Sequence, residues 1–213
     1  MQKLEAKDIK NIFDIIANIM EKNKQKLIEL DSILGDGDLG LTMSKGFNKI
    51  SEEFKSLGDF YDIGNLFLKA GMVIAETVPS TMGTLIGSGL INVGKHLKNK
   101  SEIGLQDFTI LIESFTQGIM DRGKSKPGDK TIVDALYPAI IILKEEVLKN
   151  STLKRGINLA LDAAKKGAES TKNMVSKHGR AAYYQEKSIG KQDPGSEVGV
   201  LFLSAFADYI NSH

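Results

Sequence analysis

Apolar residues recur along almost the whole chain with the spacing of one face of an α-helix. A period of three to four residues predicts amphipathic helices, and we expect about eight of them. The first apolar stripe consists of Ile9, Phe13, Ile16 and Met20. The other stripes span Met43–Phe54, Ile63–Ile74, Ile86–Leu97, Phe108–Ile119, Leu136–Val147, about 152–176 and Val198–Tyr209.

Residues that end helices separate these stripes. Breaks are expected at Gly58-Asp59, Pro79, Lys98-Asn99-Lys100 and Arg122-Gly123. No stretch alternates apolar and polar residues with the period of a β-strand. Because most connections are short, neighbouring helices should run antiparallel. The sequence therefore predicts one all-α domain over residues 1–213, an antiparallel up-and-down eight-helix barrel or bundle.

In such a bundle every second connection lies at the same end. The connections after the first, third, fifth and seventh helices should therefore be neighbours, and they hold the polar and glycine-rich segments of the chain. These segments are Leu30–Gly40, Thr77–Gly83, Arg122–Thr131 and His178–Gly195. The connections at the opposite end, near 57–60, 98–104 and 148–152, have no comparable composition. We expect the functional site at the first end.

The connection after the first helix places Asp31, Asp36 and Asp38 within eight residues, among three glycines. Carboxylates this close repel one another unless a cation lies between them. Hard divalent ions such as Mg²⁺ and Ca²⁺ prefer carboxylate oxygens, and glycine allows the tight turns that aim several side chains at one point. The alternative is an acidic connection between helices that binds nothing.

Two familiar motifs are excluded. Counted from Asp36, an EF-hand loop would need a ligand at Gly40 and a bidentate Glu at Phe47, so a calcium sensor is excluded. The segment after Gly123 resembles a phosphate-binding P-loop, but Asp129 stands where the motif needs its Gly-Lys-Ser/Thr, and no strand precedes it. This basic segment could still contact phosphate or a purine ring.

Two further segments suit phosphate. Ser80 and Thr81 stand at a helix start, where free N–H groups and the helix dipole attract anions, although taken alone they are better explained by ordinary capping. Arg180 offers a guanidinium fork that matches phosphate oxygens. His178 lacks a partner nucleophile in the sequence, so a catalytic triad is not indicated.

Composition narrows the class of protein. Lys and Arg total 28 against 27 Asp and Glu, which argues against binding to nucleic acid or to a membrane surface. Cysteine is absent, which excludes disulfides and thiolate chemistry. The N-terminal residues lack the apolar core of a signal peptide, and no segment approaches the ~20 apolar residues of a membrane span. We expect a cytoplasmic protein.

The four connections together resemble the nucleotide-binding L subunits of bacterial dihydroxyacetone kinases that depend on the phosphotransferase system. The resemblance covers the chain from end to end. The matching residues are Leu30–Gly40 with its Asp-x4-Asp-x-Asp spacing, Met43–Phe47, Arg122–Lys124, Pro127–Thr131, Gly179–Ala181, Ser188–Gly190 and Gln192–Gly195. It implies an eight-helix barrel with ADP and magnesium at one rim.

The resemblance also implies roles for individual residues. Asp31, Asp36 and Asp38 would hold magnesium, with two ions against the nucleotide phosphates. Arg180 would be catalytic and would also contact the nucleotide. The remaining nucleotide-binding residues would be Leu39, Gly40, Leu41, Thr42, Thr81, Met82, Gly123, Ile132, Asp193, Pro194 and Gly195.

The chain departs from the family pattern at four positions. Many relatives have His at position 39 and Asn at position 42, where this chain has Leu39 and Thr42. Ser80 and Met82 replace a common Gly and Ser in the phosphate loop. These changes concern the phosphate contacts and the choice of partner, while the magnesium ligands are retained.

In the family, bound ADP accepts a phosphoryl group from a phosphohistidine on one partner, a phosphotransferase subunit, and passes it to dihydroxyacetone on a second, dihydroxyacetone-binding subunit. The resemblance implies the same for this chain; a homodimer is left open. The alternatives are a subunit that uses exchangeable ATP for a related keto-sugar or polyol, a nucleotide-sensing regulatory subunit, and a purely structural bundle. The last does not explain the acids.

Overall fold

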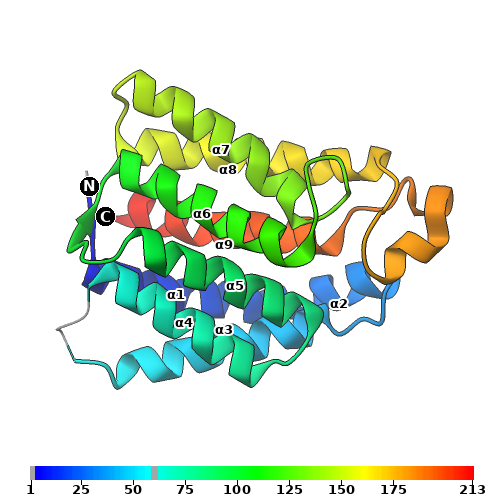
Figure 1. The fold of residues 1–213 in the computed structure, drawn as a ribbon, viewed down its shortest axis with the longest axis horizontal. Helices are drawn as coiled ribbons and strands as arrows, with labels where there is room; N and C mark the ends of the chain where they lie inside the picture. The colour runs from blue at the N-terminus through cyan, green and yellow to red at the C-terminus, as the bar shows by residue number, and fades with distance from the viewer. Residues whose placement is uncertain (1–2, 59–61) are drawn as a thin grey trace.

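The computed structural model describes residues 3–58 and 62–213, and these residues are predominantly helical (Figure 1). The strands are β1 (Leu4–Glu5) and β2 (Glu102–Ile103). The α-helices are α1 (Ala6–Lys22), α2 (Lys24–Ser32), α3 (Leu39–Lys55), α4 (Ile63–Thr77), α5 (Thr81–His96), α6 (Leu105–Gly123), α7 (Ile132–Leu148), α8 (Leu153–Ser170) and α9 (Pro194–Ser212). Two 3-10 helices, η1 (Thr171–Asn173) and η2 (Arg180–Ser188), lie between α8 and α9.

The long helices form a closed ring. From α3 to α9 each helix packs against the next one along the chain, α1 packs against α3, and α9 returns to α1. In Figure 1 these helices run side by side along the long axis, and both chain termini lie at one end. The all-α barrel or bundle predicted from the apolar stripes is confirmed.

Aromatic side chains from three helices meet inside the ring. Phe202 of α9 stacks on Phe115 of α6 with ring centroids 4.7 Å apart, and it lies edge-on to Phe206 at 5.4 Å. Phe47 of α3 lies 6.5 Å from Phe202 on another side. All four rings are fully or almost fully buried. The sequence stripes therefore converge on one core, and α9 contributes its central ring.

The structure departs from the predicted helices in two places. The first helix is interrupted at Asn23, where the side-chain amide donates to the carbonyl oxygen of Ile19 and competes with the helical pattern. The helix expected over 152–176 ends at Ser170, because the carbonyl groups of Thr171 and Met174 turn to accept hydrogen bonds from Lys130.

The sequence pattern did not predict one short pair of strands. β1 and β2 pair antiparallel, with Leu4 opposite Ile103, but two residues are too few to show an alternating pattern. The break predicted at Gly58-Asp59, and with it part of the connection near 57–60, falls partly outside the described residues.

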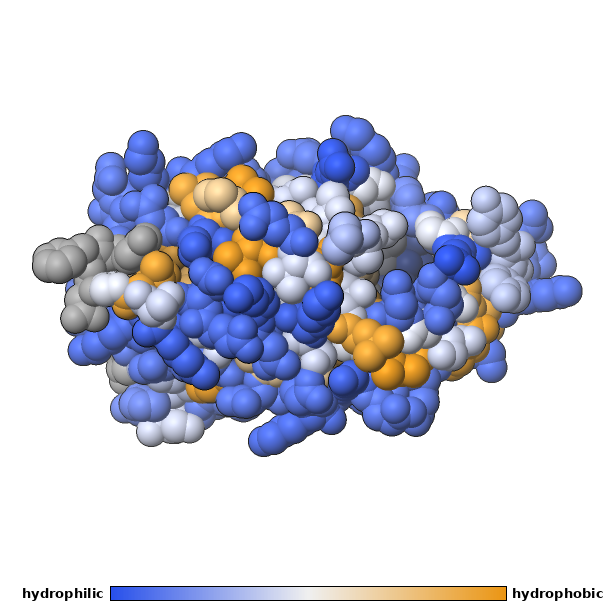
Figure 2. Space-filling view, turned by 90° about the horizontal axis from the view of Figure 1, so that it is seen from below, coloured by the Kyte–Doolittle hydropathy of each residue, from blue (hydrophilic) through white to orange (hydrophobic). Residues whose placement is uncertain are grey.

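The four polar connections lie at one end of the ring, opposite the chain termini (Figure 1). The turns after α2, α4 and α6 and the long segment between α8 and α9 meet there, as the up-and-down prediction required. Hydrophilic residues cover most of the face in Figure 2, with small apolar areas between them. Among the described residues, none of the helices combines the length and apolarity of a membrane span.

Candidate functional site

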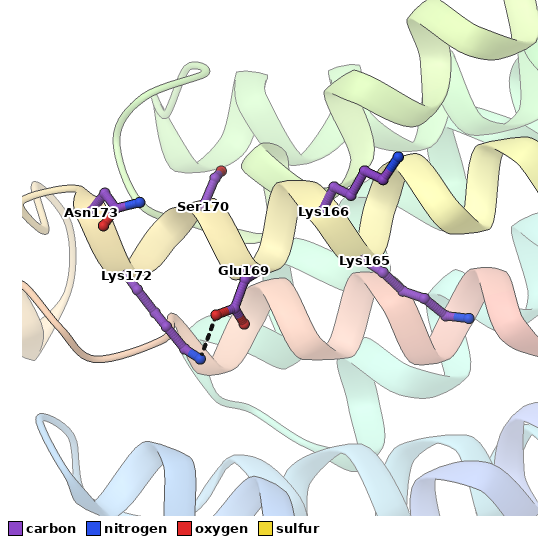
Figure 3. A pocket seen from close by; sticks show the side chains of 6 residues that line it. All are labelled: Lys165, Lys166, Glu169, Ser170, Lys172 and Asn173. Atoms are coloured by element: carbon purple, nitrogen blue, oxygen red, sulfur yellow. Dashed lines mark hydrogen bonds and ion pairs between the residues drawn. The ribbon is translucent and has the colours of Figure 1, made fainter.

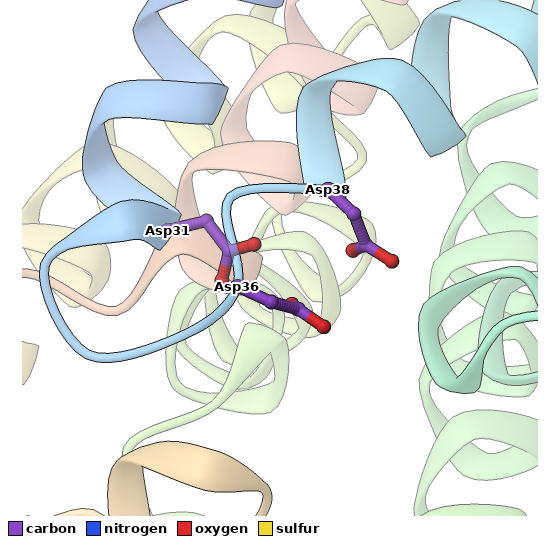
Figure 4. Close-up of side chains that lie close together, drawn as sticks. All are labelled: Asp31, Asp36 and Asp38. Carbon is purple, nitrogen blue, oxygen red and sulfur yellow. The ribbon is translucent and has the colours of Figure 1, made fainter.

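Three carboxylates converge at the acidic connection. Asp31, Asp36 and Asp38 each offer an oxygen, and these oxygens all lie within 4.8 Å of one another. Asp31 comes from the last turn of α2, Asp36 from the turn and Asp38 from the residue before α3 (Figure 4). Asp36 and Asp38 are exposed and Asp31 is half-buried. The predicted cluster exists, and it is open to a ligand from solvent.

Backbone geometry aims these acids. Gly37 has φ +73°, a left-handed conformation that glycine adopts without strain. At Gly40 a side chain would collide with the carbonyl oxygen of Lys24, so glycine allows α3 to start directly against α2. The N–H of Leu39 donates to Asp31 Oδ2 at 3.3 Å and ties the two helix ends together. The turn is therefore built to hold the carboxylates close.

Electrostatics favour a cation at this point. Partial desolvation raises the pKa of Asp38, and the charges of Asp36 and Asp31 raise it further, while Arg180 opposes them. A divalent ion between the carboxylates would remove this repulsion. Three convergent carboxylates are the donor set that Mg²⁺ and Ca²⁺ prefer, so these residues fit the magnesium expected here.

Arg180 reaches the acidic cluster from the segment between α8 and α9. Its Nη2 lies 2.7 Å from Asp36 Oδ2, so the predicted arginine and one predicted metal ligand are neighbours. A pocket of about 520 Å³ opens beside this pair, lined by Leu34, Gly35, Arg180, Tyr183 and Tyr184. Arg180 thus borders a pocket together with two phenol rings, and it also contacts the acidic cluster through Asp36.

A second pocket of the same volume lies on the outer surface at the end of α8. It is lined by Lys165, Lys166, Glu169, Ser170, Lys172 and Asn173. In Figure 3 these side chains point outward in different directions, and Glu169 is paired with Lys172. These side chains do not converge on one point. The two pockets have the same volume, and the one beside Arg180 is distinguished by its contact with the acidic cluster.

Three helix N-termini meet next to the acidic cluster. Ser80, Thr131 and Asp193 cap α5, α7 and α9, and each accepts a hydrogen bond from the first turn of its helix. A Cβ atom on Gly195 would lie 3.0 Å from Met82 Cε and 3.5 Å from the backbone nitrogen of Ile132. Helix N-termini carry partial positive charge, so this grouping suits the anionic part of a ligand.

Asp193, which caps α9, has a strongly raised pKa. Burial of its carboxyl group raises the pKa of Asp193 to about 7. The carboxylates of Asp134 and Asp31 act in the same direction, whereas the N–H of Ser196 and the ammonium group of Lys130 act against it. The start of α9 is therefore electrostatically coupled to the acidic turn.

The remaining predicted residues divide into buried and exposed groups. The side chains of Leu39 and Ile132 lie in the core, only 4% and 2% exposed, so they can offer the site only backbone groups. Thr42 is also buried, whereas Leu41 is 53% exposed. The remaining residues at this end are Gly40, Thr81, Gly123 and Pro194; a Cβ on Gly123 would touch Leu85 in the first turns of α5.

Several residues important to this end of the molecule were not singled out from the sequence. Lys130 is buried, and its ammonium group binds four backbone carbonyls. Tyr183 and Tyr184 line the pocket beside Arg180. Asp129 accepts hydrogen bonds from the Lys126 N–H and from His178. Nothing in their local sequence signals these contacts, which join segments far apart in the chain.

Comparison with known proteins identifies the family. The family model described as the DAK2 domain matches residues 33–208. The chain belongs to the DAK2 domain family. It is 31% identical over 200 residues to the ADP-binding subunit DhaL of the PEP-dependent dihydroxyacetone kinase of Escherichia coli, covering 94% of each chain. The resemblance inferred from the four connections is confirmed.

Two further relatives show the range of the family. The chain is 31% identical over 193 residues to the ADP-binding subunit DhaL of the PTS-dependent dihydroxyacetone kinase of Lactococcus lactis, covering 90% of this chain and 91% of that protein. It is 29% identical over 199 residues to the L-erythrulose kinase of Pectobacterium atrosepticum, covering 93% of this chain but 33% of that enzyme.

Solved structures confirm the fold. The native dihydroxyacetone kinase of C. freundii matches 94% of this chain with a TM-score of 0.75 at 21% identity. The same kinase in complex with AMP-PNP and Mg²⁺ matches 98% with a TM-score of 0.71. This chain spans about a third of the length of that kinase. At 21% identity the match shows that the two proteins share the same arrangement of helices.

Proposed function

We propose that this chain is the ADP-binding subunit of a phosphoenolpyruvate-dependent dihydroxyacetone kinase. Its bound nucleotide would accept a phosphoryl group from a phosphohistidine partner and pass it to dihydroxyacetone held on another subunit. The observation that carries the proposal is the meeting of Asp31, Asp36 and Asp38 with Arg180 at one rim of the ring. The subunit relatives, matched over nearly their whole length, support it.

The three carboxylates would hold magnesium, and we propose two ions. Bound magnesium would neutralise phosphate oxygens and fix their orientation. The carboxylates alone would repel a polyphosphate, so their role is to bind the cation and place it at the rim. This arrangement suits phosphoryl transfer, which depends mainly on positioning and on neutralising charge.

The remaining residues would bind and orient the nucleotide. The N–H groups at the starts of α5, α7 and α9 face one region, and Thr81, Met82 and Gly195 stand in these first turns. Gly123 and the backbone of Ile132 would border the base. The side chain of Arg180 is 69% exposed, and its guanidinium group would exchange its partner Asp36 for an oxygen of the transferred group. Asp193 and Pro194 would close the site.

The relatives suggest a second candidate, a kinase subunit that uses exchangeable ATP on a related keto-sugar. It is favoured by the similarity to an erythrulose kinase. Nucleotide exchange separates the two. A coenzyme should stay bound through gel filtration and exchange slowly, whereas a substrate nucleotide should be lost and replaced rapidly by labelled ATP.

Reconstitution tests the proposal directly. The purified chain would be mixed with a dihydroxyacetone-binding subunit and a phosphohistidine-carrying phosphotransferase subunit, and dihydroxyacetone phosphate would be measured. We expect product with phosphoenolpyruvate and the general phosphotransferase proteins as donor, and none with ATP alone. Product from ATP without the phosphohistidine partner would contradict the proposal and favour the second candidate.

A further inference from the structure

Lys130 is a buried lysine directly before α7, only 3% exposed. Its Nζ atom lies 2.6 to 3.2 Å from the backbone carbonyl oxygens of four residues, so its three N–H groups serve four acceptors and one N–H is shared. These residues are Thr171, Met174, Ser188 and Lys191. The ammonium group therefore lies in a cage of carbonyl oxygens, and no acidic side chain is among these partners.

The four carbonyls belong to the two ends of one segment. Thr171 and Met174 stand where the chain leaves α8, and Ser188 and Lys191 stand where it returns towards α9. Two further bonds join the same ends. The N–H of Gly190 donates to the carbonyl of Lys172 at 2.7 Å, and the N–H of Ser176 donates to Ser188 Oγ at 3.0 Å. The segment 171–191 is thus a closed loop with Lys130 at its neck.

Burying a lysine at this position costs free energy unless its ammonium group is hydrogen-bonded. Burial lowers the pKa of Lys130, opposed by the nearby charge of Asp193. The backbone at Lys130 is left-handed, with φ +63°, which L-residues adopt at an energetic cost. An uncharged side chain there would remove the donor to the carbonyls of Met174 and Lys191 and leave those of Thr171 and Ser188 with only a backbone N–H each, and buried polar groups need partners.

The body of the loop carries the groups that face the site. Arg180 extends from it to Asp36. Beyond the neck, the N–H of Asp193 donates to Thr171 Oγ1 at 3.0 Å, so the start of α9 is tied to the same neck. The ammonium group of Lys130 connects the α7 start to both of these elements.

We propose that Lys130 is a positioning residue, whose caged ammonium group closes the neck of the 171–191 loop and so holds Arg180 and Asp193 at the nucleotide site. The link to nucleotide rests on the proposed function; closure of the neck does not. An open neck would let the loop body, with Arg180, move away from the acidic turn while the helical ring stays folded.

Hydrogen exchange and limited proteolysis on Lys130→Met test the closure. Methionine replaces the aliphatic part of the side chain at nearly its full length and lacks the ammonium group. We expect the amides of Ser176 and Gly190 to exchange about 10- to 100-fold faster, the loss expected for hydrogen bonds to a charged group. Trypsin should cleave the loop sooner, with amides of the helical ring unchanged. Lys165→Met, at an exposed lysine of α8, is the matched control and should change neither readout.

Chemical rescue separates positioning from a general structural role. Lys130→Ala removes three methylene groups and the ammonium group, which is the size of propylammonium. Propylammonium chloride should restore loop protection and ADP affinity in Lys130→Ala, and tetramethylammonium chloride at the same ionic strength should restore neither. Rescue by both salts, or by neither while the variant is folded, would overturn the proposal.

A spectroscopic test uses the wild-type protein and needs a variant only to assign the signal. A caged ammonium group should give a slowly exchanging lysine Nζ resonance at neutral pH, absent from Lys130→Arg. If every lysine Nζ exchanges as fast as in free lysine, the cage does not exist. Should the loop readouts succeed while wild-type protein fails to bind ADP, the proposed function would be wrong and closure of the neck would stand.

Discussion

The guanidinium group of Arg180 lies 2.7 Å from the carboxylate of Asp36, and this contact joins the long segment before α9 to the acidic turn after α2. The two residues are 69% and 39% exposed, so the ion pair adds little to stability. Its significance is spatial. It places a positive side chain beside the one cluster of acids in the described residues that fits a divalent ion.

Asp36→Asn removes one charged ligand from this cluster. We expect magnesium-dependent ADP binding to weaken by at least roughly 100-fold, because even outer partners of metal ligands contribute 10- to 100-fold. Calorimetric titration of ADP with and without Mg²⁺ measures this, and far-UV circular dichroism should show unchanged helicity. Asp162→Asn on α8 is the control. Retained affinity in Asp36→Asn would count decisively against the three-aspartate site.

Arg180→Gln removes the guanidinium group and keeps a polar side chain. We expect phosphoryl transfer in the reconstituted system to fall by about 100- to 1,000-fold, the usual loss for one donor to a transferred group. The free energy of unfolding should change by less than about 1 kcal/mol, since the pair is exposed. Lys187→Gln in the same segment serves as control, and equal rates in both variants would exclude the catalytic role.

Gly40→Ala tests the close contact between α2 and α3. The added methyl group would meet the carbonyl oxygen of Lys24, so the two helix ends must move apart and Asp31 must shift relative to Asp38. We expect a loss of about 1–3 kcal/mol in unfolding free energy, together with weaker magnesium binding. Urea unfolding and metal titration measure both. Gly104→Ala, where the methyl group meets open space, should have neither effect.

The lowered pKa of Asp129 makes the free energy of unfolding depend on pH. Burial would raise its pKa, but hydrogen bonds from His178 and the Lys126 N–H and the ion pair with Lys177 lower the pKa of Asp129 to about 2, below its ordinary value of 3.8. Because the folded protein holds this proton less tightly than the unfolded chain, the stabilisation is complete above about pH 5 and is lost as the pH falls towards 2.

Asp129→Asn should therefore lower the free energy of unfolding at pH 6 by about 2 kcal/mol, following from the size of the shift. The difference from the wild type should shrink as the pH falls from 4 to 2. Denaturant unfolding across this range measures it, with Asp208→Asn as control. A difference that is constant with pH would show that the carboxylate charge is not responsible.

Phe202→Ala would remove the ring at the centre of the aromatic core, between Phe115, Phe206 and Phe47. We expect a loss of about 3–5 kcal/mol in unfolding free energy, from lost burial and the remaining cavity. Phe202→Leu should lose less. Thermal unfolding ranks the three proteins, and ADP affinity of the folded fraction should stay near that of the wild type. An equal loss in both variants would contradict the cavity argument.

Local pattern was enough for most of the helices. Stripes such as Phe108–Ile119 lie inside observed helices, because burying one face of a helix requires that spacing. The local pattern also predicted that Asp31, Asp36 and Asp38 lie close together, since all three flank or belong to one short connection between helices. It failed at Asn23 and beyond Ser170, where a hydrogen bond from a particular side chain ends a helix that its apolar stripe would continue.

Patterns along the chain were enough to predict the class of fold, the end of the bundle where the polar connections meet and the acidic cluster. The first two follow from the apolar period and the alternation of short connections, and the third follows from spacing within one short stretch. The folded structure was needed to show that Arg180 contacts Asp36, that Lys130 donates to both ends of the loop carrying Arg180 and that burial raises the pKa of Asp193. These relationships join residues from 40 to more than 140 positions apart, and their energies depend on burial, which no local pattern contains.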